Sequence, residues 1–237
     1  MVNSKVYLIP VALHEDQAAL KCLPGYIMDV IKQCRIFFTE NQRTARRFLK
    51  KLMPEINIDS YEWHTIAETG TETSNQFKKN ILEGKTIGIM SEAGCPGIAD
   101  PGQELVMIAQ QMNAEVIPLV GPNAILLALM ASGMNGQCFR FVGYLPVQSH
   151  ERKKMIHELE NDSAKKNCTE IFIETPYRNN QLLNDLVSTA RPQTLLCIAM
   201  DLTAVTQFAK TKKIEEWKKQ SLDLHKHPAI FLLYSGT

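Results

Sequence analysis

The sequence lacks the short motifs that identify several common enzyme classes. It contains no GxSxG, no GxxxxGK[ST] and no GxGxxG, which are typical of α/β-hydrolases, P-loop proteins and dinucleotide-binding domains respectively. Its six cysteines form no CxxC pair, and its six histidines lack the spacing of metal ligands. We therefore expect no metal site. The unpaired cysteines favour a reducing, cytoplasmic location over a disulfide-bonded fold.

Long apolar runs and an excess of charge of one sign are also absent. No run reaches the roughly 18 residues that a membrane span needs, and the N-terminal residues do not resemble a signal peptide. The chain has 26 basic and 25 acidic residues, a formal net charge of +1. Any contact with nucleic acid would therefore need a local basic patch.

Short apolar segments alternate with helical segments along the 237 residues, a pattern typical of α/β proteins. The segment 132–137 contains two glycines and an asparagine after an apolar helix and marks a boundary. We therefore predict two α/β lobes, residues 1–136 and 137–237, with a ligand cleft between them. The expected strands are 6–13, 35–39, 86–91, 116–120, 139–144, 170–174, 194–201 and 229–235, and the expected helices include 44–53, 73–83, 102–112, 124–132, 150–161, 179–190 and 214–220.

The most informative segment is SEAGCPGIADPG at residues 91–102, between an expected strand and an expected helix. Ligands of open α/β sheets bind beyond the carboxyl ends of the strands. Glycines there allow close approach to the backbone, and prolines fix the loop. Asp100, Pro101 and Gln103 also fit the start of a helix with a capping box, which leaves 91–97 as the part that indicates binding.

Three further segments are candidates for a site. PLVGPNA at 118–124 is a second turn from strand to helix, with Gly121 suited to close backbone approach or to a simple helix start. At 174–178, the sequence ETPYR places Glu174, Tyr177 and Arg178 at one strand end, where they would bind a polar substrate or form an ion pair. After the second strand, Arg43, Arg46, Arg47 and Lys50 share one helix face, which suits RNA phosphates or is a solvated surface.

In this order, the turns resemble those of the tetrapyrrole methylase superfamily, and more narrowly its branch that methylates a ribose 2′-hydroxyl in small-subunit ribosomal RNA. The branch's SDAGTPxISDPG is matched at 91–102, and its PxPGPSA at 118–124. Its FxGFLP is matched by FVGYLP at 141–146, its ExPHR by ETPYR, and its EDTR by ENQR at 40–43. Its RELTK is matched in part at 200–203, and HPA at 227–229 resembles a strand entry of the wider superfamily.

The sequence differs from that branch at two places, which favours a sister branch. The sequence does not identify the methyl acceptor of such a branch. The branch has a TPxGN loop after its first strand, whereas residues 10–16 here contain no glycine, and Asn41 stands where aspartate is usual. The resemblance still implies a homodimer of two-lobed chains that bind S-adenosylmethionine in the cleft. The implied donor-binding residues are Glu92, Gly94, Cys95, Ile98, Ala99, Asn123 and Ala124, with Met200, Leu202, Pro228 and Ala229 closing the adenine side.

The acceptor side is an expectation of the same kind. A hydroxyl acceptor needs a base, and Glu40, Glu92 and Glu174 are the candidates, with no choice among them from sequence. The residues expected to bind ribosomal RNA are Arg43, Arg46, Arg47, Tyr177 and Arg178. Two alternatives stay open: a methyltransferase acting on a small molecule such as a tetrapyrrole, and a non-catalytic RNA-binding relative.

Overall fold

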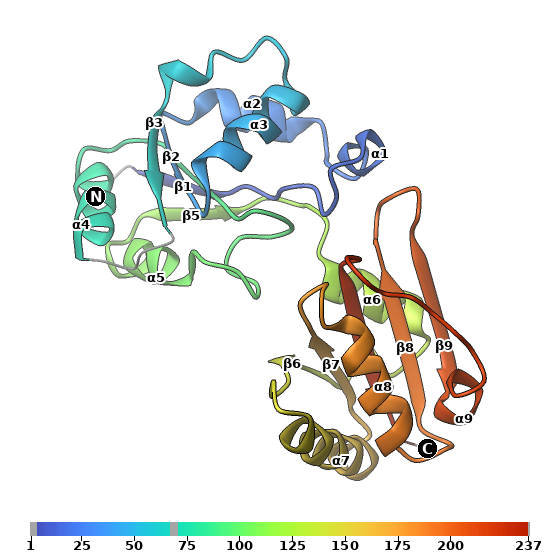
Figure 1. Ribbon diagram of the computed structural model, residues 1–237. Coiled ribbons are helices and arrows are strands. Elements are labelled where there is room, and N and C mark those ends of the chain that lie inside the picture. The colour runs from blue at the N-terminus through green and yellow to red at the C-terminus, as the bar shows by residue number, and fades with distance from the viewer. Residues whose placement is uncertain (1–3, 67–70, 237) are drawn as a thin grey trace. The chain divides into compact units, whose positions relative to one another are not determined.

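The computed structural model describes residues 4–66 and 71–236. The chain divides into two compact units, Met1–Asn123 and Ala124–Thr237. Each unit contains one five-stranded sheet with helices packed on it (Figure 1). This is the α/β class that the alternating pattern predicts.

The sheet of the first unit is entirely parallel, in the order β3-β2-β4-β1-β5. The chain leaves β1 toward one edge of the sheet and later leaves β4 toward the other. The loops that follow these two neighbouring strands therefore diverge, which creates the kind of switch point where α/β sheets bind ligands. The strands are β1 (Lys5–Leu8), β2 (Ile36–Thr39), β3 (Glu62–Thr65), β4 (Ile87–Met90) and β5 (Glu115–Pro118).

Helices cover both faces of this sheet, because neighbouring strand residues point to opposite sides. Phe37 packs with the cluster that includes α2 and α3, and Phe38 with the cluster that includes α4 and α5. The helical elements are α1 (Gln17–Leu20), α2 (Tyr26–Gln33), α3 (Gln42–Leu52), the 3-10 helix η1 (Ile58–Ser60), α4 (Thr71–Leu82) and α5 (Gln103–Gln111).

The sheet of the second unit is mixed, in the order β6-β7-β10-β8-β9. β6 is parallel to β7, and β10 runs antiparallel to both β7 and β8. The start of β10 therefore lies between the last residues of β7 and β8, with Ala229 opposite Met200 and Ile230 opposite Ile173. The strands are β6 (Phe139–Tyr144), β7 (Thr169–Ile173), β8 (Leu195–Met200), β9 (Phe208–Lys213) and β10 (Ala229–Tyr234).

The helices of the second unit also lie on both faces of its sheet. The four are α6 (Ala124–Ser132), α7 (Ser149–Lys166), α8 (Asn179–Thr189) and α9 (Ile214–Trp217). The last three pack around Phe172 and Phe231, and the buried Arg152 of α7 pairs with Asp185 of α8. α6 contacts β8, β9 and β10. The compact units consequently divide before α6, whereas the sequence places a boundary after it, at 136.

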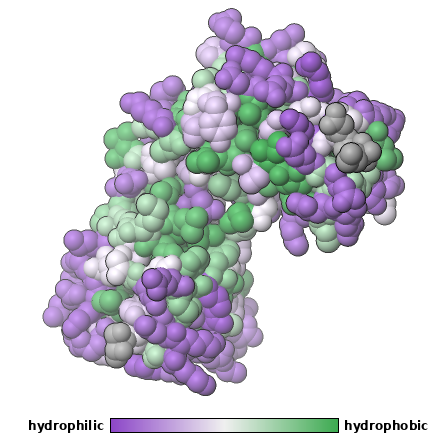
Figure 2. All heavy atoms as spheres, turned by 180° about the vertical axis from the view of Figure 1, so that it is seen from behind, coloured by the Kyte–Doolittle hydropathy of each residue, from purple (hydrophilic) through white to green (hydrophobic). Residues whose placement is uncertain are grey.

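Apolar side chains reach the surface as well as the core (Figure 2). In the second unit, Met130, Tyr144 and Val147 are among the exposed large hydrophobic residues. Within the described ranges 4–66 and 71–236, no helix has the length and apolar character needed to cross a membrane.

Candidate functional site

The loops after β1 and β4 are joined by a reciprocal pair of backbone hydrogen bonds. The Val11 amide donates to the Gly94 carbonyl at 2.8 Å, and the Gly94 amide donates to the Val11 carbonyl at 3.0 Å. β1 ends at Leu8, earlier than predicted, because Pro10 has no amide hydrogen to continue the ladder. Gly94 has a φ of +70°, which few other residues adopt. The bridge fixes both loops at the switch point of the sheet.

The loop after β5 packs against these two loops. An ideal Cβ at Gly121 would lie 2.2 Å from Pro10 Cβ, so only glycine fits there. The Cys95 thiol donates to the Pro122 carbonyl at 3.5 Å. Burial raises the pKa of this thiol, and a hydrogen bond with Asn123 acts in the opposite direction. The predicted residues Gly94, Cys95 and Asn123 thus come together from two motifs.

The other residues of the first lobe that are predicted to bind the donor are close in sequence to Gly94 and Asn123 but differ in exposure and in backbone conformation. Ile98 is half exposed, and Ala99 is exposed with a φ of +60°. Ala124 begins α6 and is the first residue of the second unit.

Two of the candidate bases meet at the ends of β2 and β4. Glu40 Oε2 accepts a hydrogen bond from the Glu92 amide at 2.9 Å, and Thr44 Oγ1 donates to Glu92 Oε1 at 3.2 Å. Asp100 belongs to the same group of charges. Burial, followed by the charge of Glu40, raises the pKa of Asp100 to about 6 despite a hydrogen bond with Ser91.

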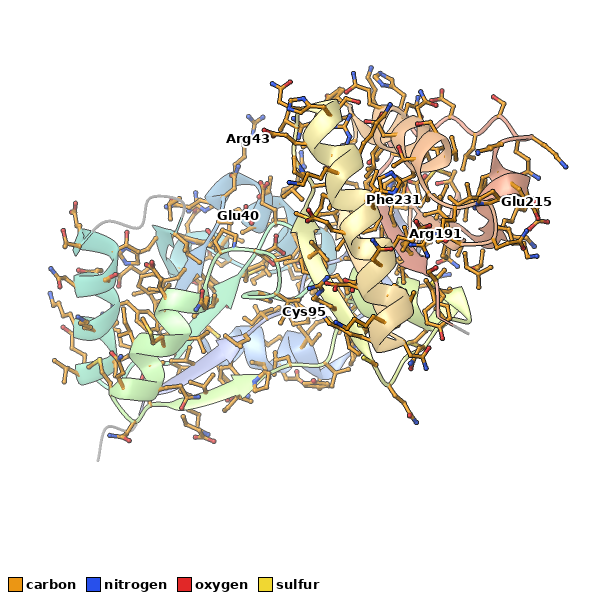
Figure 3. The ribbon with its side chains drawn as sticks, turned by 90° about the horizontal axis from the view of Figure 1, so that it is seen from below. Glu40, Arg43, Cys95, Arg191, Glu215 and Phe231 are labelled. Atoms are coloured by element: carbon orange, nitrogen blue, oxygen red, sulfur yellow. The ribbon has the colours of Figure 1, made fainter. Side chains whose placement is uncertain are left out.

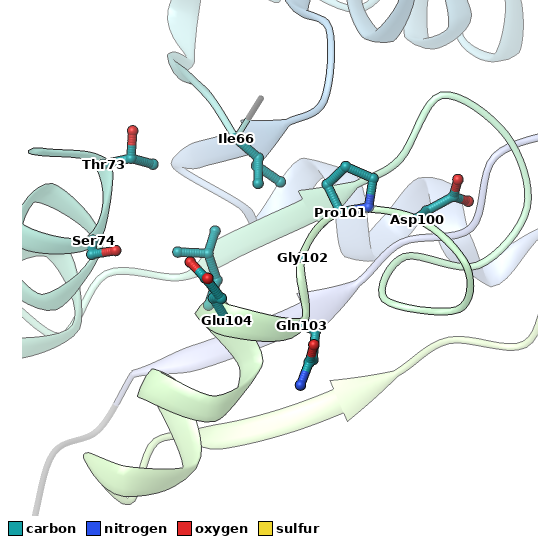
Figure 4. A pocket seen from close by; sticks show the side chains of 9 residues that line it. Ile66, Thr73, Ser74, Asp100, Pro101, Gly102, Gln103 and Glu104 are labelled. Atoms are coloured by element: carbon teal, nitrogen blue, oxygen red, sulfur yellow. The ribbon is translucent and has the colours of Figure 1, made fainter. Parts of the chain in front are cut away.

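The predicted capping role of Asp100 is wrong. α5 begins at Gln103, and its N-cap is Gly102, with a φ of +123° and no side-chain cap. The positive φ of Gly102 turns the chain into the helix, so the carboxyl group of Asp100 stays in the loop. Asp100 instead lines a cavity of about 160 Å³. The cavity lies at the starts of α4 and α5 (Figure 4), and its lining includes Ile66, Thr73, Ser74, Gln103 and Glu104.

The basic helix α3 is only partly free to bind a ligand. Arg46 pairs with Asp59 at 3.2 Å and lies over the Trp63 ring, and Arg47 pairs with Glu15. Arg43 is exposed at the start of the helix (Figure 3) and forms no ion pair within the described residues. Of the predicted arginines, Arg43 is thus the most available to an RNA phosphate.

In the second unit, the turn after β7 forms the ion pair that the sequence left as an alternative. Glu174 Oε1 accepts from Arg178 Nη2 at 2.7 Å and from the Thr175 amide at 2.7 Å. Tyr177 is largely exposed and makes an edge contact with the His225 ring. α8 starts at Asn179, where the helix expected over 179–190 begins.

The remaining predicted residues gather where β8 ends and β10 begins. Met200 and Ala229 are opposite each other, Leu202 is buried, and Pro228 is exposed. The Asp201 amide donates to the Pro228 carbonyl at 3.0 Å, which joins the two strand ends.

One pair of side chains at this end of the sheet was not expected from the sequence. His227 Nδ1 lies 2.7 Å from Asp201 Oδ2. The two residues are 26 positions apart, so no local motif shows them together. The pair could be found from sequence only by pairing the strand that ends at Met200 antiparallel to the strand that begins at Ala229. That pairing places Asp201 and His227 at the same end of the sheet. No group of three or more metal-ligating side chains occurs in the part of the chain that the structure describes.

Solved structures with a similar fold are methyltransferases. The structure of the methyltransferase CobJ superposes with a TM-score of 0.62 at 14% identity, covering 98% of this chain and 93% of that one. The cobalt precorrin-4 methyltransferase CbiF gives a TM-score of 0.60 at 11% identity, covering 97% and 94%. These similarities establish the fold. No family model matches the chain.

Sequence relatives point to a narrower group. The chain is 31% identical over 212 residues to the ribosomal RNA small subunit methyltransferase I of Bacillus subtilis, covering 90% of this chain and 65% of that protein. It is 33% identical over 157 residues to the protein of that name from Halalkalibacterium halodurans, covering 66% and 52%. The chain is therefore similar in sequence to these ribosomal RNA methyltransferases and similar in fold to the solved methyltransferases. This confirms the resemblance carried by the 91–102 and 118–124 motifs. The chain spans about half to two thirds of the length of the curated relatives it matches.

Proposed function

We propose that this chain is a member of the tetrapyrrole methylase superfamily and an S-adenosylmethionine-dependent methyltransferase that modifies a ribose 2′-hydroxyl of ribosomal RNA. The observation that carries the proposal is the 31% identity, over 90% of the chain, to a ribosomal RNA small subunit methyltransferase I. The arrangement of the three joined loops at the switch point supports it, because this is where α/β sheets bind ligands.

The loops of the first unit suit a ligand that approaches the backbone. Where the loops after β1, β4 and β5 meet, the chain presents Ala93, Gly94, Cys95 and Gly121, whose side chains are small or absent. When bound, S-adenosylmethionine supplies a methyl group already activated by its sulfonium. The protein's own task is therefore to position the reactants and exclude water.

Each group of predicted residues has a proposed part in that task. The backbone around Gly94, Cys95 and Asn123 holds the donor, and the apolar Met200, Leu202, Pro228 and Ala229 contact its adenine. The protonated Cys95 thiol acts as a packed hydrogen-bond donor and not as a nucleophile, since the thiolate is the reactive form. Arg43 binds an RNA phosphate, which fixes the register of the RNA.

Calorimetry with S-adenosylmethionine, followed by transfer of labelled methyl groups, tests the proposal. The acceptor should be small ribosomal subunits from cells that lack this gene, because their target position is unmodified. We expect micromolar donor binding and label recovered as a 2′-O-methylated nucleoside. Donor binding without label in RNA would contradict the ribosomal acceptor.

The names of the structural neighbours favour one second candidate, methylation of a tetrapyrrole. The same labelled donor, offered with uroporphyrinogen III, tests it. A chain that binds no donor at all would instead be the non-catalytic relative. We also propose that the chain is cytoplasmic and forms a homodimer, with the exposed Met130, Tyr144 and Val147 as candidate contact residues.

A further inference from the structure

The pairing of Asp201 with His227 has the geometry of a proton-accepting dyad. The carboxylate of Asp201 only accepts hydrogen bonds, so the 2.7 Å contact assigns the ring proton to His227 Nδ1. His227 Nε2 then carries a lone pair, and it has no partner among the described residues. Thr206 Oγ1 also donates to Asp201 Oδ2, at 2.9 Å, and so helps to hold the carboxylate.

Burial distinguishes this pair from the other contacts between histidine and carboxylate in the described residues. The side chain of Asp201 is 2% exposed. The partners of His14, His64 and His150 are 40%, 43% and 58% exposed, and each is within two positions of its histidine. A buried carboxylate that orients a partly exposed imidazole is the arrangement that general-base histidines use. The other three pairs are ordinary surface contacts.

The backbone around Asp201 is held in an uncommon conformation. Asp201 and Thr203 have φ values of +49° and +74°. Such conformations cost free energy for residues other than glycine and cluster at functional sites. The Asp201 amide and carbonyl are both hydrogen-bonded, to Pro228 and Ala204, so the carboxylate is fixed relative to the start of β10.

Polar atoms beside the dyad point to a ligand. Asp201 Oδ1 and Thr203 Oγ1 are buried oxygens without a hydrogen-bond partner in the described part of the chain. Asn179 Oδ1, whose amide nitrogen donates to the His227 carbonyl at 2.7 Å, is a third. Buried polar atoms are almost always satisfied in folded proteins, so a cluster of unsatisfied ones calls for an explanation. These oxygens suit hydroxyl or amino groups.

We propose that His227, positioned by Asp201, accepts the proton of the substrate hydroxyl during methyl transfer. The role rests on the function proposed above. The dyad adjoins Met200, Leu202, Pro228 and Ala229, which we assign to the donor. As the acceptor oxygen bonds to the methyl carbon, the carbon–sulfur electron pair stays on sulfur. The hydroxyl proton passes to His227 Nε2 and afterwards to solvent.

The candidate carboxylates are less suited to this step. Glu174 is engaged by Arg178 and by a backbone amide, and Glu40 by the Glu92 amide. Each of these carboxylates thus already accepts hydrogen bonds from neighbouring N–H groups. Imidazole, in contrast, exchanges protons near neutral pH.

The ionisable groups on the segments at this end of the sheet come from three places. The loop after β8 provides Asp201, and the turn after β7 provides the pair of Glu174 and Arg178. That turn is tied to the segment before β10 by Asn180, which contacts Asp223 and the Leu224 amide. The ionisable groups on the segment before β10 are Asp223, His225 and Lys226.

Three variants test the proposal. His227→Ala should lower the single-turnover rate of methyl transfer by about 100-fold or more at saturating donor and RNA, leave the donor dissociation constant unchanged, and abolish the acid limb of the pH–rate profile. Added imidazole should restore part of the rate. The control is His225→Ala, an exposed histidine on the same loop, which should retain the wild-type rate.

Asp201→Asn gives a readout that does not depend on activity. Asparagine tolerates a positive φ, so the fold should be kept. Its amide would donate to Nδ1, and the ring proton should move to Nε2. Nitrogen NMR of the imidazole, on protein without donor, reports this change of tautomer directly, and the transfer rate should fall with it.

The outcomes separate this role from the proposed function. If the wild type transfers no methyl group to RNA, the proposed function fails and this role fails with it. If the wild type is active and His227→Ala keeps its rate within twofold, only this role is wrong. It is equally wrong if the loss in His227→Ala is explained by weaker donor binding, or if the tautomer is the same in wild type and Asp201→Asn.

Discussion

Gly121 lies against Pro10 with no space for a side chain, since an ideal Cβ would come within 2.2 Å of Pro10 Cβ and 2.3 Å of its Cγ. Gly121→Ala should therefore push the loops after β1 and β5 apart. We expect a loss of about 2 kcal/mol in the free energy of unfolding. Methyl transfer should fall by about tenfold or more, because reacting groups are misplaced. Chemical denaturation measures the first effect and transfer of labelled methyl groups the second, and calorimetry measures the affinity for the donor.

The control for this variant is Gly136→Ala. Gly136 is exposed, has no positive φ, and has nothing within 4 Å of the added Cβ. Its substitution should change neither stability nor donor affinity. Equal donor affinity for Gly121→Ala and wild type would show that the joined loops do not form the donor site.

The Cys95 thiol should have low reactivity. Because burial raises its pKa, the thiol stays protonated at neutral pH and reacts slowly with iodoacetamide, unlike the exposed Cys22 and Cys138. Cys95→Ser should retain most of the methyl transfer, since serine also donates to the Pro122 carbonyl. Mass spectrometry of the labelled protein checks the first point. A methylated Cys95 appearing during turnover would contradict this description.

Asp100 should make the protein less stable at neutral pH than in mild acid. Its pKa is raised to about 6 in the folded state, above the ordinary value near 4. The folded state therefore binds the proton more tightly, and stability falls as the pH rises from about 4 to about 6. Asp100→Asn should raise the Tm by about 2–4 °C at pH 7, a modest value because the residue is partly exposed.

The difference in Tm between wild type and Asp100→Asn should close as the pH falls to about 4. Asp223→Asn is a control of opposite sign. The pKa of Asp223 is lowered, first by its hydrogen bond with Asn180. Asp223 therefore stabilises the fold at any pH above the ordinary aspartate pKa near 4, and its contribution is lost as the pH falls below that value. A pH-independent effect of Asp100→Asn would exclude the raised pKa.

Arg43 and Arg46 should behave differently although they are one helical turn apart. Arg43→Ala should leave the Tm unchanged and lower the slope of log affinity for RNA against log salt by about 1. Arg46→Ala should cost about 1 kcal/mol of stability, because its guanidinium packs on Trp63 and pairs with Asp59. Filter binding across salt concentrations and thermal unfolding separate the two. If Arg43→Ala leaves the slope intact, the start of α3 is not an RNA contact.

Most strands could be predicted from sequence because they are apolar and buried. β4 and β6 were expected within one residue of their observed bounds. The two missed strands are edge strands with polar sequences, EWHT in β3 and FAKTKK in β9. Polar residues, lysine especially, protect exposed edges from unwanted pairing. The same residues remove the hydrophobic pattern by which a strand is recognised.

The local structure of the loops after β4 and β5 was predictable for a different reason. The backbone itself needs glycine at 94, for its positive φ, and at 121, for close packing. The motifs that contain these glycines can therefore be recognised from the sequence alone. The contact of Asp201 with His227 and the environment of Asp100 arise from residues brought together by strand pairing and helix capping. Those relationships depend on the register of the sheet, which the sequence did not reveal.

The reciprocal hydrogen bonds between Val11 and Gly94 make the loops after β1 and β4 a single cooperative unit. Neither amide can exchange its hydrogen with solvent unless the bridge opens, and opening it releases both at once. The two amides should therefore share one protection factor against exchange and respond together to a bound ligand. A molecule that contacts only the 91–102 loop would then also slow exchange at Val11, and the loop after the first strand would report on ligand binding without touching the ligand.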